Sequence, residues 1–115
     1  MKLGRWKRVG VVALGTLCGL PIDTFAGQVT GTVEAVEARA SDGLVLVYIN
    51  ATATGKPSCA TAPYWIVLNE NSEAGKKQYA MLLTAKASGE TVTIYGLNTC
   101  TRWSDGEDID WITIS

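Results

Sequence analysis

The chain of 115 residues contains no histidine. Histidine is the commonest general base in hydrolases and the commonest metal ligand, so sites built on a Ser-His or Cys-His pair are excluded. Proline and phenylalanine are also scarce, with three residues and one residue, and cysteine occurs at three positions. The length is sufficient for one small domain.

The first 26 residues have the features of an export signal. Four basic residues lie within 2–8, and an apolar run of 12 residues, 9–20, follows them. This run is shorter than the roughly 18 residues that a membrane-spanning helix needs. Thr24 and Ala26 are small residues at the positions that signal peptidase reads, so we expect cleavage before Gly27. The mature chain is then expected to be periplasmic or secreted, without a membrane span.

The expected mature chain, 27–115, carries six basic and ten acidic residues, a net charge of −4. The mature chain has no excess of basic residues with which to bind phosphates, so nucleic acid is not an expected partner. Cys59 and Cys100 remain after removal of the leader, and an even pair in an exported chain predicts one disulfide. Two thiols without histidine cannot complete a tetrahedral zinc site, so we expect neither a metal nor another cofactor.

Alternating apolar and polar residues predict a mainly β chain. Strands are predicted at 28–38, 44–52, 64–68, 91–98 and 108–115. Gly31, inside the first of them, indicates a bend or bulge. The turn sequence at 41–43 (SDG) favours positive φ and joins the first two strands in a hairpin.

A single amphipathic helix is predicted within 69–89. Apolar residues recur at helical spacing, at Tyr79, Leu82, Leu83 and Ala87. Asn71 or Ser72 can cap its start, and Gly89 supplies its end. The order strand, strand, strand, helix, strand, strand predicts one five-stranded OB-like barrel over 27–115. The alternative is an open antiparallel sheet with one helix packed on it, which would leave the apolar strand 44–52 as an exposed edge.

Carboxylates are the remaining conventional acid or base groups, and four of them gather near the C-terminus, at Asp105, Glu107, Asp108 and Asp110. Their spacing does not follow the register of a calcium-binding loop, so we expect a solvated turn. Glu34 and Glu37 fall on opposite faces of a strand and do not face each other across a cleft. We therefore do not expect an enzyme.

Aromatic and polar residues flank both cysteines of the predicted disulfide. The bridge would draw these segments together at one end of the barrel, where their composition suits a polar ligand such as the face of a sugar. The candidate residues there are Tyr64, Trp65, Arg102, Trp103 and Asp105. The alternative for Trp65 is a place in the core, and a core position is also expected for Trp111.

Four segments carry a family resemblance: 30–33 (TGTV), 79–83 (YAMLL), 88–95 (SGETVTIY) and 98–100 (NTC). Through them the chain from 29 to 100 resembles small exported bacterial OB-fold proteins related to the receptor-binding B subunit of subtilase cytotoxin. The resemblance implies a ring of five copies, each binding a cell-surface glycan on its barrel.

The resemblance also concerns single positions. In toxin subunits of this type a hydroxyl residue just before the first-strand glycine takes part in glycan binding, and Thr30 occupies that position here. A tyrosine of the toxin subunit is replaced by Gly96, and the cysteines are placed differently. A sialic-acid-type specificity and an equivalent bridge are therefore not implied.

Together these observations predict an exported, non-enzymatic binding protein with a glycan as its ligand, and the resemblance implies a homopentamer as its assembly. The alternative is a periplasmic structural or protein-interaction module, whose apolar last strand pairs with a partner chain. Fold analogy does not by itself choose between the two.

Overall fold

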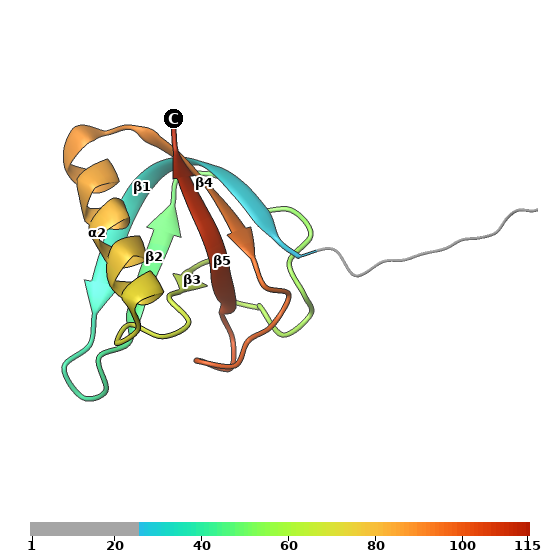
Figure 1. Ribbon diagram of the computed structural model, residues 1–115. Coiled ribbons are helices and arrows are strands. Elements are labelled where there is room, and N and C mark those ends of the chain that lie inside the picture. The colour runs from blue at the N-terminus through green and yellow to red at the C-terminus, as the bar shows by residue number, and fades with distance from the viewer. Residues whose placement is uncertain (1–25) are drawn as a thin grey trace, which may run out of the picture.

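The computed structural model describes residues 26–115, so the predicted leader lies outside the described residues except for Ala26. The elements are β1 (Gln28–Ala38), β2 (Val45–Ile49), β3 (Trp65–Ile66), α2 (Glu73–Ser88), β4 (Thr91–Gly96) and β5 (Glu107–Ile114) (Figure 1). This order confirms the predicted one. Within the described part of the chain, no helix is both long enough and apolar enough to span a bilayer.

The five strands close into a barrel in the order β1-β2-β3-β5-β4. All neighbouring strands are antiparallel except β3 and β5, which run parallel. The fold is therefore a closed, mixed, OB-like barrel with one helix, and the open-sheet alternative is wrong. Helix α2 lies beside the barrel and contacts β1 and β5 (Figure 1).

Strand β1 serves both halves of the barrel. Its first part pairs with β4, and its second part pairs with β2 after a register shift between Val33 and Ala35. The bulge predicted at Gly31 therefore lies further along the strand. Gly31 is needed for a different reason, because a Cβ there would lie 2.8 Å from the backbone oxygen of Asn50.

Strands β2 and β3 are shorter than the predicted 44–52 and 64–68. After Ile49 the chain turns, and the N–H of Ala51 donates to the Ile49 carbonyl at 2.8 Å. Beyond β3, the N–H of Val67 still donates to the Val45 carbonyl at 3.0 Å, so β2 and β3 remain hydrogen-bonded one residue past the end of β3. The predicted turn is confirmed, with φ of +79° at Gly43.

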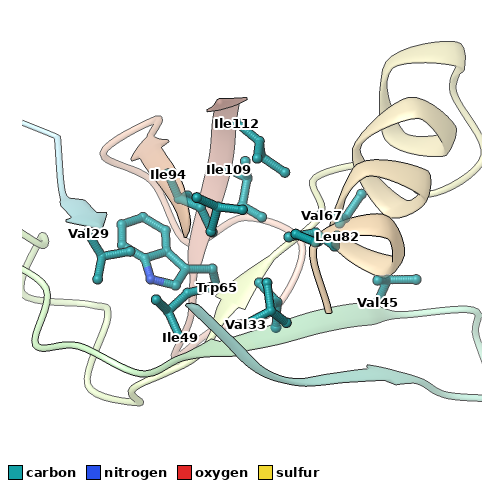
Figure 2. Close-up of a cluster of buried hydrophobic side chains, with 13 residues drawn as sticks. Val29, Val33, Val45, Ile49, Trp65, Val67, Leu82, Ile94, Ile109 and Ile112 are labelled. Carbon is teal, nitrogen blue, oxygen red and sulfur yellow. The ribbon is translucent and has the colours of Figure 1, made fainter. Parts of the chain in front are cut away.

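The apolar core fills the barrel and extends under α2. Trp65 lies among side chains that include Val29, Ile49 and Ile94, whereas Val67 and Leu82 lie together beside α2 (Figure 2). The helix contributes Leu82 and Ala85, both 0% exposed. Two positions predicted for its apolar face are wrong, because Leu83 is 44% exposed and Ala87 is also exposed.

The structure confirms the predicted capping residues at both ends of α2. The Ser72 hydroxyl accepts a hydrogen bond from the N–H of Gly75 at 3.0 Å, which caps the first turn. Gly89 follows the last turn with φ of +73°, and its N–H donates to the Ala85 carbonyl at 2.9 Å. Glu73 lies in the first turn, where the positive end of the helix dipole favours a carboxylate.

The predicted disulfide between Cys59 and Cys100 is confirmed, with 6.2 Å between the two Cα atoms. It joins the long β2–β3 loop to the long β4–β5 loop. Neither loop has regular structure beyond one isolated bridge, between Thr54 and Gln28. The covalent link therefore fixes the end of the barrel at which both loops meet.

Candidate functional site

The disulfide draws two of the predicted residues, Tyr64 and Asp105, into direct contact, as expected. The Tyr64 hydroxyl donates a hydrogen bond to the Asp105 carboxylate, and the N–H of Ala62 donates to the Asp105 carbonyl at 3.0 Å. The hydrogen bond to Asp105 raises the pKa of Tyr64. The Tyr64 ring also packs edge to face on Tyr48, with 5.7 Å between the ring centroids.

Arg102 connects three segments at the same end of the barrel. Its guanidinium donates to both carboxylate oxygens of Glu70, from Nε at 3.2 Å and from Nη2 at 3.1 Å. Nη2 also donates to the backbone oxygen of Asp42 at 3.1 Å. The hydrogen bonds from Arg102 lower the pKa of Glu70. Arg102 therefore clamps the β1–β2 loop and the segment before α2 to the β4–β5 loop.

Trp103 is covered on one face by Arg39. The guanidinium carbon lies 4.3 Å from the ring centroid, within the range of a cation–π contact. Arg39 also forms a bidentate pair with Asp42, at 3.0 and 2.7 Å, and this hydrogen bonding lowers the pKa of Asp42 far below its usual range. Trp103 is 38% exposed.

These contacts define a loop clamp, whose residues are Arg39, Asp42, Tyr64, Glu70, Arg102, Trp103 and Asp105. Its charged groups largely bind one another. The arrangement holds together the β1–β2, β2–β3 and β4–β5 loops and the segment before α2, and it leaves few free hydrogen-bonding groups for a ligand.

Trp65 lies in the core, which was the alternative interpretation of this residue. Its side chain is 1% exposed, and its ring packs against Val29 and Ile49 inside the barrel (Figure 2). Trp65 therefore offers no surface on which a ligand could stack. The Nζ atom of Lys56 lies 4.5 Å from its ring centroid.

The expectation of a solvated turn around 105–110 is wrong for two residues, because Glu107 and Asp108 are both 0% exposed. The Asp108 carboxylate accepts four hydrogen bonds, from the hydroxyls of Thr99 and Thr101 and from the N–H groups of Thr101 and Arg102. Burial alone would raise the pKa of Asp108, but the four hydrogen bonds outweigh it and the pKa is lowered.

Thr30 lies on a different surface, the outer face of β1, β4 and β5. We call this surface the threonine face, and its residues are Gln28, Thr30, Thr32, Thr91, Thr93, Tyr95, Trp111 and Thr113. The register places Thr30 beside Thr93, and Thr93 beside Thr113. The hydroxyls of Thr30 and Thr93 are 2.9 Å apart and hydrogen-bonded. No hydrogen bond or ring contact among residues 26–115 joins Thr30 to the loop clamp.

Trp111 belongs to this face and not to the core, so the core prediction for it is wrong. The pairing of β4 with β5 passes from Tyr95–Trp111 directly to Gly96–Ile109, which leaves Asp110 as an extra residue. The bulge reverses the alternation, so Ile109 points inward and Trp111 outward. Trp111 is 56% exposed, and its ring meets that of Tyr95 edge to face at 4.8 Å.

Of the threonine face, sequence reasoning named only Thr30 as a candidate and missed the aromatic pair Trp111 and Tyr95 along with the remaining residues. A strict two-residue period assigns Trp111 to the same face as Ile109, which is buried. The only unusual local feature of the sequence is the run of acidic residues around the start of β5, and such a run does not indicate a bulge.

Across the described residues, no three cysteine or acidic side chains converge to form a possible metal site. Comparison of the chain with protein-family models, curated proteins and solved structures gives no match. The loop clamp and the threonine face are therefore the two candidate surfaces of the described residues.

Proposed function

We propose that this protein is an exported, non-enzymatic binding protein that recognises a carbohydrate on its threonine face. The observation that carries the proposal is the exposure of Trp111, 56% of its surface, beside Tyr95 and rows of threonine hydroxyls. An aromatic ring that stands in solvent on a rigid sheet can stack on the apolar face of a sugar. The neighbouring hydroxyls can donate to and accept from the sugar hydroxyls.

The chemistry of the face favours a neutral glycan. None of its eight side chains is charged, so it has no guanidinium or ammonium group to hold a carboxylate or sulfate. The loop clamp supplies cations, but Arg39 and Arg102 already bind carboxylates there. The replacement of the toxin tyrosine by Gly96 also counts against a sialic-acid-type specificity.

The resemblance to the subtilase cytotoxin B subunit supports the same surface. It assigns glycan contact to the hydroxyl residue before the first-strand glycine, and Thr30 lies in the threonine face. The same resemblance suggests a ring of five copies. The molar mass of the oxidised, exported protein in solution tests that assembly, with five times the chain mass expected.

The binding proposal is tested by a glycan array with three proteins: the wild type, Trp111→Ala and Trp103→Ala. Loss of one stacking ring costs about 1–2 kcal/mol, so we expect Trp111→Ala to bind roughly 5- to 30-fold more weakly. Trp103→Ala removes an exposed tryptophan of the loop clamp and is the matched control, expected to bind as the wild type does. Folding of each variant is checked by circular dichroism.

Three results would contradict the proposal. A folded wild type that binds no glycan would favour the structural or protein-interaction module. Loss of binding with Trp103→Ala alone would transfer the ligand to the loop clamp. Binding of anionic glycans only would contradict the inference from the uncharged face.

A further inference from the structure

Glu107 is a fully buried carboxylate with one unsatisfied oxygen. Its Oε2 accepts hydrogen bonds from the backbone N–H groups of Gly27, at 3.0 Å, and Asn98, at 2.9 Å. Its Oε1 is buried and has no hydrogen-bond partner among the described residues. An ionised carboxylate away from water is costly unless a cation or a full set of donors compensates it. Among residues 26–115, no cation forms a salt bridge with this carboxylate and no donor reaches Oε1.

Lys56 forms neither a hydrogen bond nor a salt bridge with the Glu107 carboxylate. Its Nζ donates to the carbonyls of Ala62 and Tyr64, both at 3.2 Å, and lies over the Trp65 ring. Burial lowers the pKa of Lys56, and the charge of Glu107 opposes that shift. The salt bridges found among residues 26–115 do not include Glu107.

Gly27 is held tightly against the same carboxylate. It is buried, and a Cβ on it would lie 2.2 Å from Oε1 of Glu107. Its carbonyl accepts from the N–H of Gly96 at 2.9 Å, and the next residue, Gln28, exchanges two backbone hydrogen bonds with Thr54. These contacts fix Gly27 from its C-terminal side. Its position therefore does not require a covalent bond to Ala26.

Gly27 is also the residue at which the sequence predicts leader cleavage. Hydrolysis of the Ala26–Gly27 bond by signal peptidase adds water across the amide, leaves a carboxylate on Ala26 and frees the Gly27 amine. That amine takes up a proton near neutral pH and becomes an ammonium group. We propose that Glu107 is the buried acceptor for this ammonium group, and that the new ion pair stabilises the folded barrel of the exported protein.

The change of the Gly27 amide into an ammonium group supplies the missing cation and the missing donor to Glu107. The amide of Gly27 has one N–H and no charge, whereas the ammonium group has three N–H donors and a full positive charge. One donor keeps the bond to Oε2, and a second can reach Oε1 on the other side of the same carboxylate. The first residue must be glycine, because any side chain would collide with Oε1. This inference depends on the cleavage site and not on carbohydrate binding.

The test begins with the full chain exported by its own leader. The intact mass of the product is expected to correspond to a chain that begins at Gly27. An acylating reagent used near pH 7 then labels α-amines, and labelling is followed by peptide mass spectrometry. We expect the Gly27 amine of the folded protein to react at least about tenfold more slowly than in urea, because labelling requires local opening.

Two exported variants make the test specific to Glu107. Glu107→Gln keeps the shape but removes the charge, and we expect faster labelling of Gly27 and a melting temperature lower by roughly 10 °C or more. Asp110→Asn removes an exposed carboxylate of the same strand and is the matched control, expected to stay within about 2 °C. The solvent-exposed lysines report whether reagent activity is equal.

A third variant covers the case in which Glu107→Gln does not fold. One alanine is inserted between Ala26 and Gly27, and its product is selected by mass as one residue longer than the wild type. We expect a lower melting temperature and an amine that labels freely. The proposal is overturned if the wild-type product begins elsewhere, if its amine labels as fast as in urea, or if the longer product is as stable as the wild type.

Discussion

At the scale of the residue, the adjacent carboxylates Glu107 and Asp108 have different roles at the start of β5. Both are fully buried. Asp108 accepts four hydrogen bonds from residues 99–102 and so shapes the β4–β5 loop. Glu107 faces the other way, toward Gly27 and Asn98. Together they fix the loop on one side and the first residue of the barrel on the other.

The role of Asp108 predicts the effect of Asp108→Asn. The new amide group would present donors to N–H and O–H groups that already donate, so we expect a loss of about 2–4 kcal/mol in the free energy of unfolding at pH 7. Urea denaturation of the oxidised protein measures it. The exposed Asp110→Asn serves as control, with an expected change within about 0.5 kcal/mol. Equal effects of the two changes would contradict the role given to Asp108.

The same residue predicts part of the acid sensitivity. The pKa of Asp108 is lower in the folded protein than its ordinary value of 3.8. Its stabilisation is therefore complete above the unfolded-state pKa and is lost as the pH falls through the folded-state pKa. We expect the difference in unfolding free energy between wild type and Asp108→Asn to shrink as the pH falls below about 4. A difference that stays constant down to pH 2 would refute this.

At the scale of the element, α2 shows why a helical face is hard to assign from sequence. Its ends follow from local chemistry, because Ser72 and Gly89 act within one turn of themselves. Its buried side depends on packing, since small residues occur all around the helix. The buried positions are Gly75, Leu82 and Ala85, whereas the larger Leu83 faces solvent.

For Gly75→Ala we expect a loss of stability, although helix propensity alone predicts a gain. Alanine is favoured over glycine in a helix interior by about 1 kcal/mol. A Cβ at Gly75 would, however, lie 1.8 Å from the backbone oxygen of Asn69, just before the helix. We expect Gly75→Ala to destabilise the protein by about 1–3 kcal/mol, as overpacking does. Thermal melting checks the sign, with the exposed Lys77→Ala as control. A stabilised Gly75→Ala would show that the preceding loop yields easily.

The same division between local and distant causes explains what the sequence could predict. The order of elements, the caps of α2, the turn at Gly43 and the disulfide follow from nearby residues or from cysteine count. The bulge at Asp110 depends on the register with β4, and it alone decides that Trp111 is exposed. The burial of Glu107 depends on Gly27, which lies 80 residues earlier in the chain, and on Gly96, and neither contributes a side chain.

At the scale of the whole molecule, the barrel has two surfaces of contrasting character. The loop clamp is charged and bound to itself, whereas the threonine face is neutral and stands on three paired strands. The rigid sheet keeps Trp111 and Tyr95 in fixed positions, so little conformational entropy would be lost if the proposed carbohydrate bound there.

The Cys59–Cys100 bridge predicts a large effect on global stability. It closes a loop with a sequence separation of 41 residues, for which the chain-entropy relation gives about 4 kcal/mol. We expect the double change Cys59→Ala with Cys100→Ala to lower the free energy of unfolding by about 2–4 kcal/mol. Addition of a reducing agent should do the same to the wild type and nothing to the double variant. A wild type that is insensitive to reduction would contradict this contribution.

The bridge also bears on when the barrel would become stable during the export that the sequence predicts. Disulfides form outside the reducing cytoplasm, so a chain still inside lacks this link. For the export that the sequence predicts, the precursor would therefore have the less stable barrel of the reduced chain. Full stability would follow only in the compartment where Cys59 and Cys100 can be oxidised.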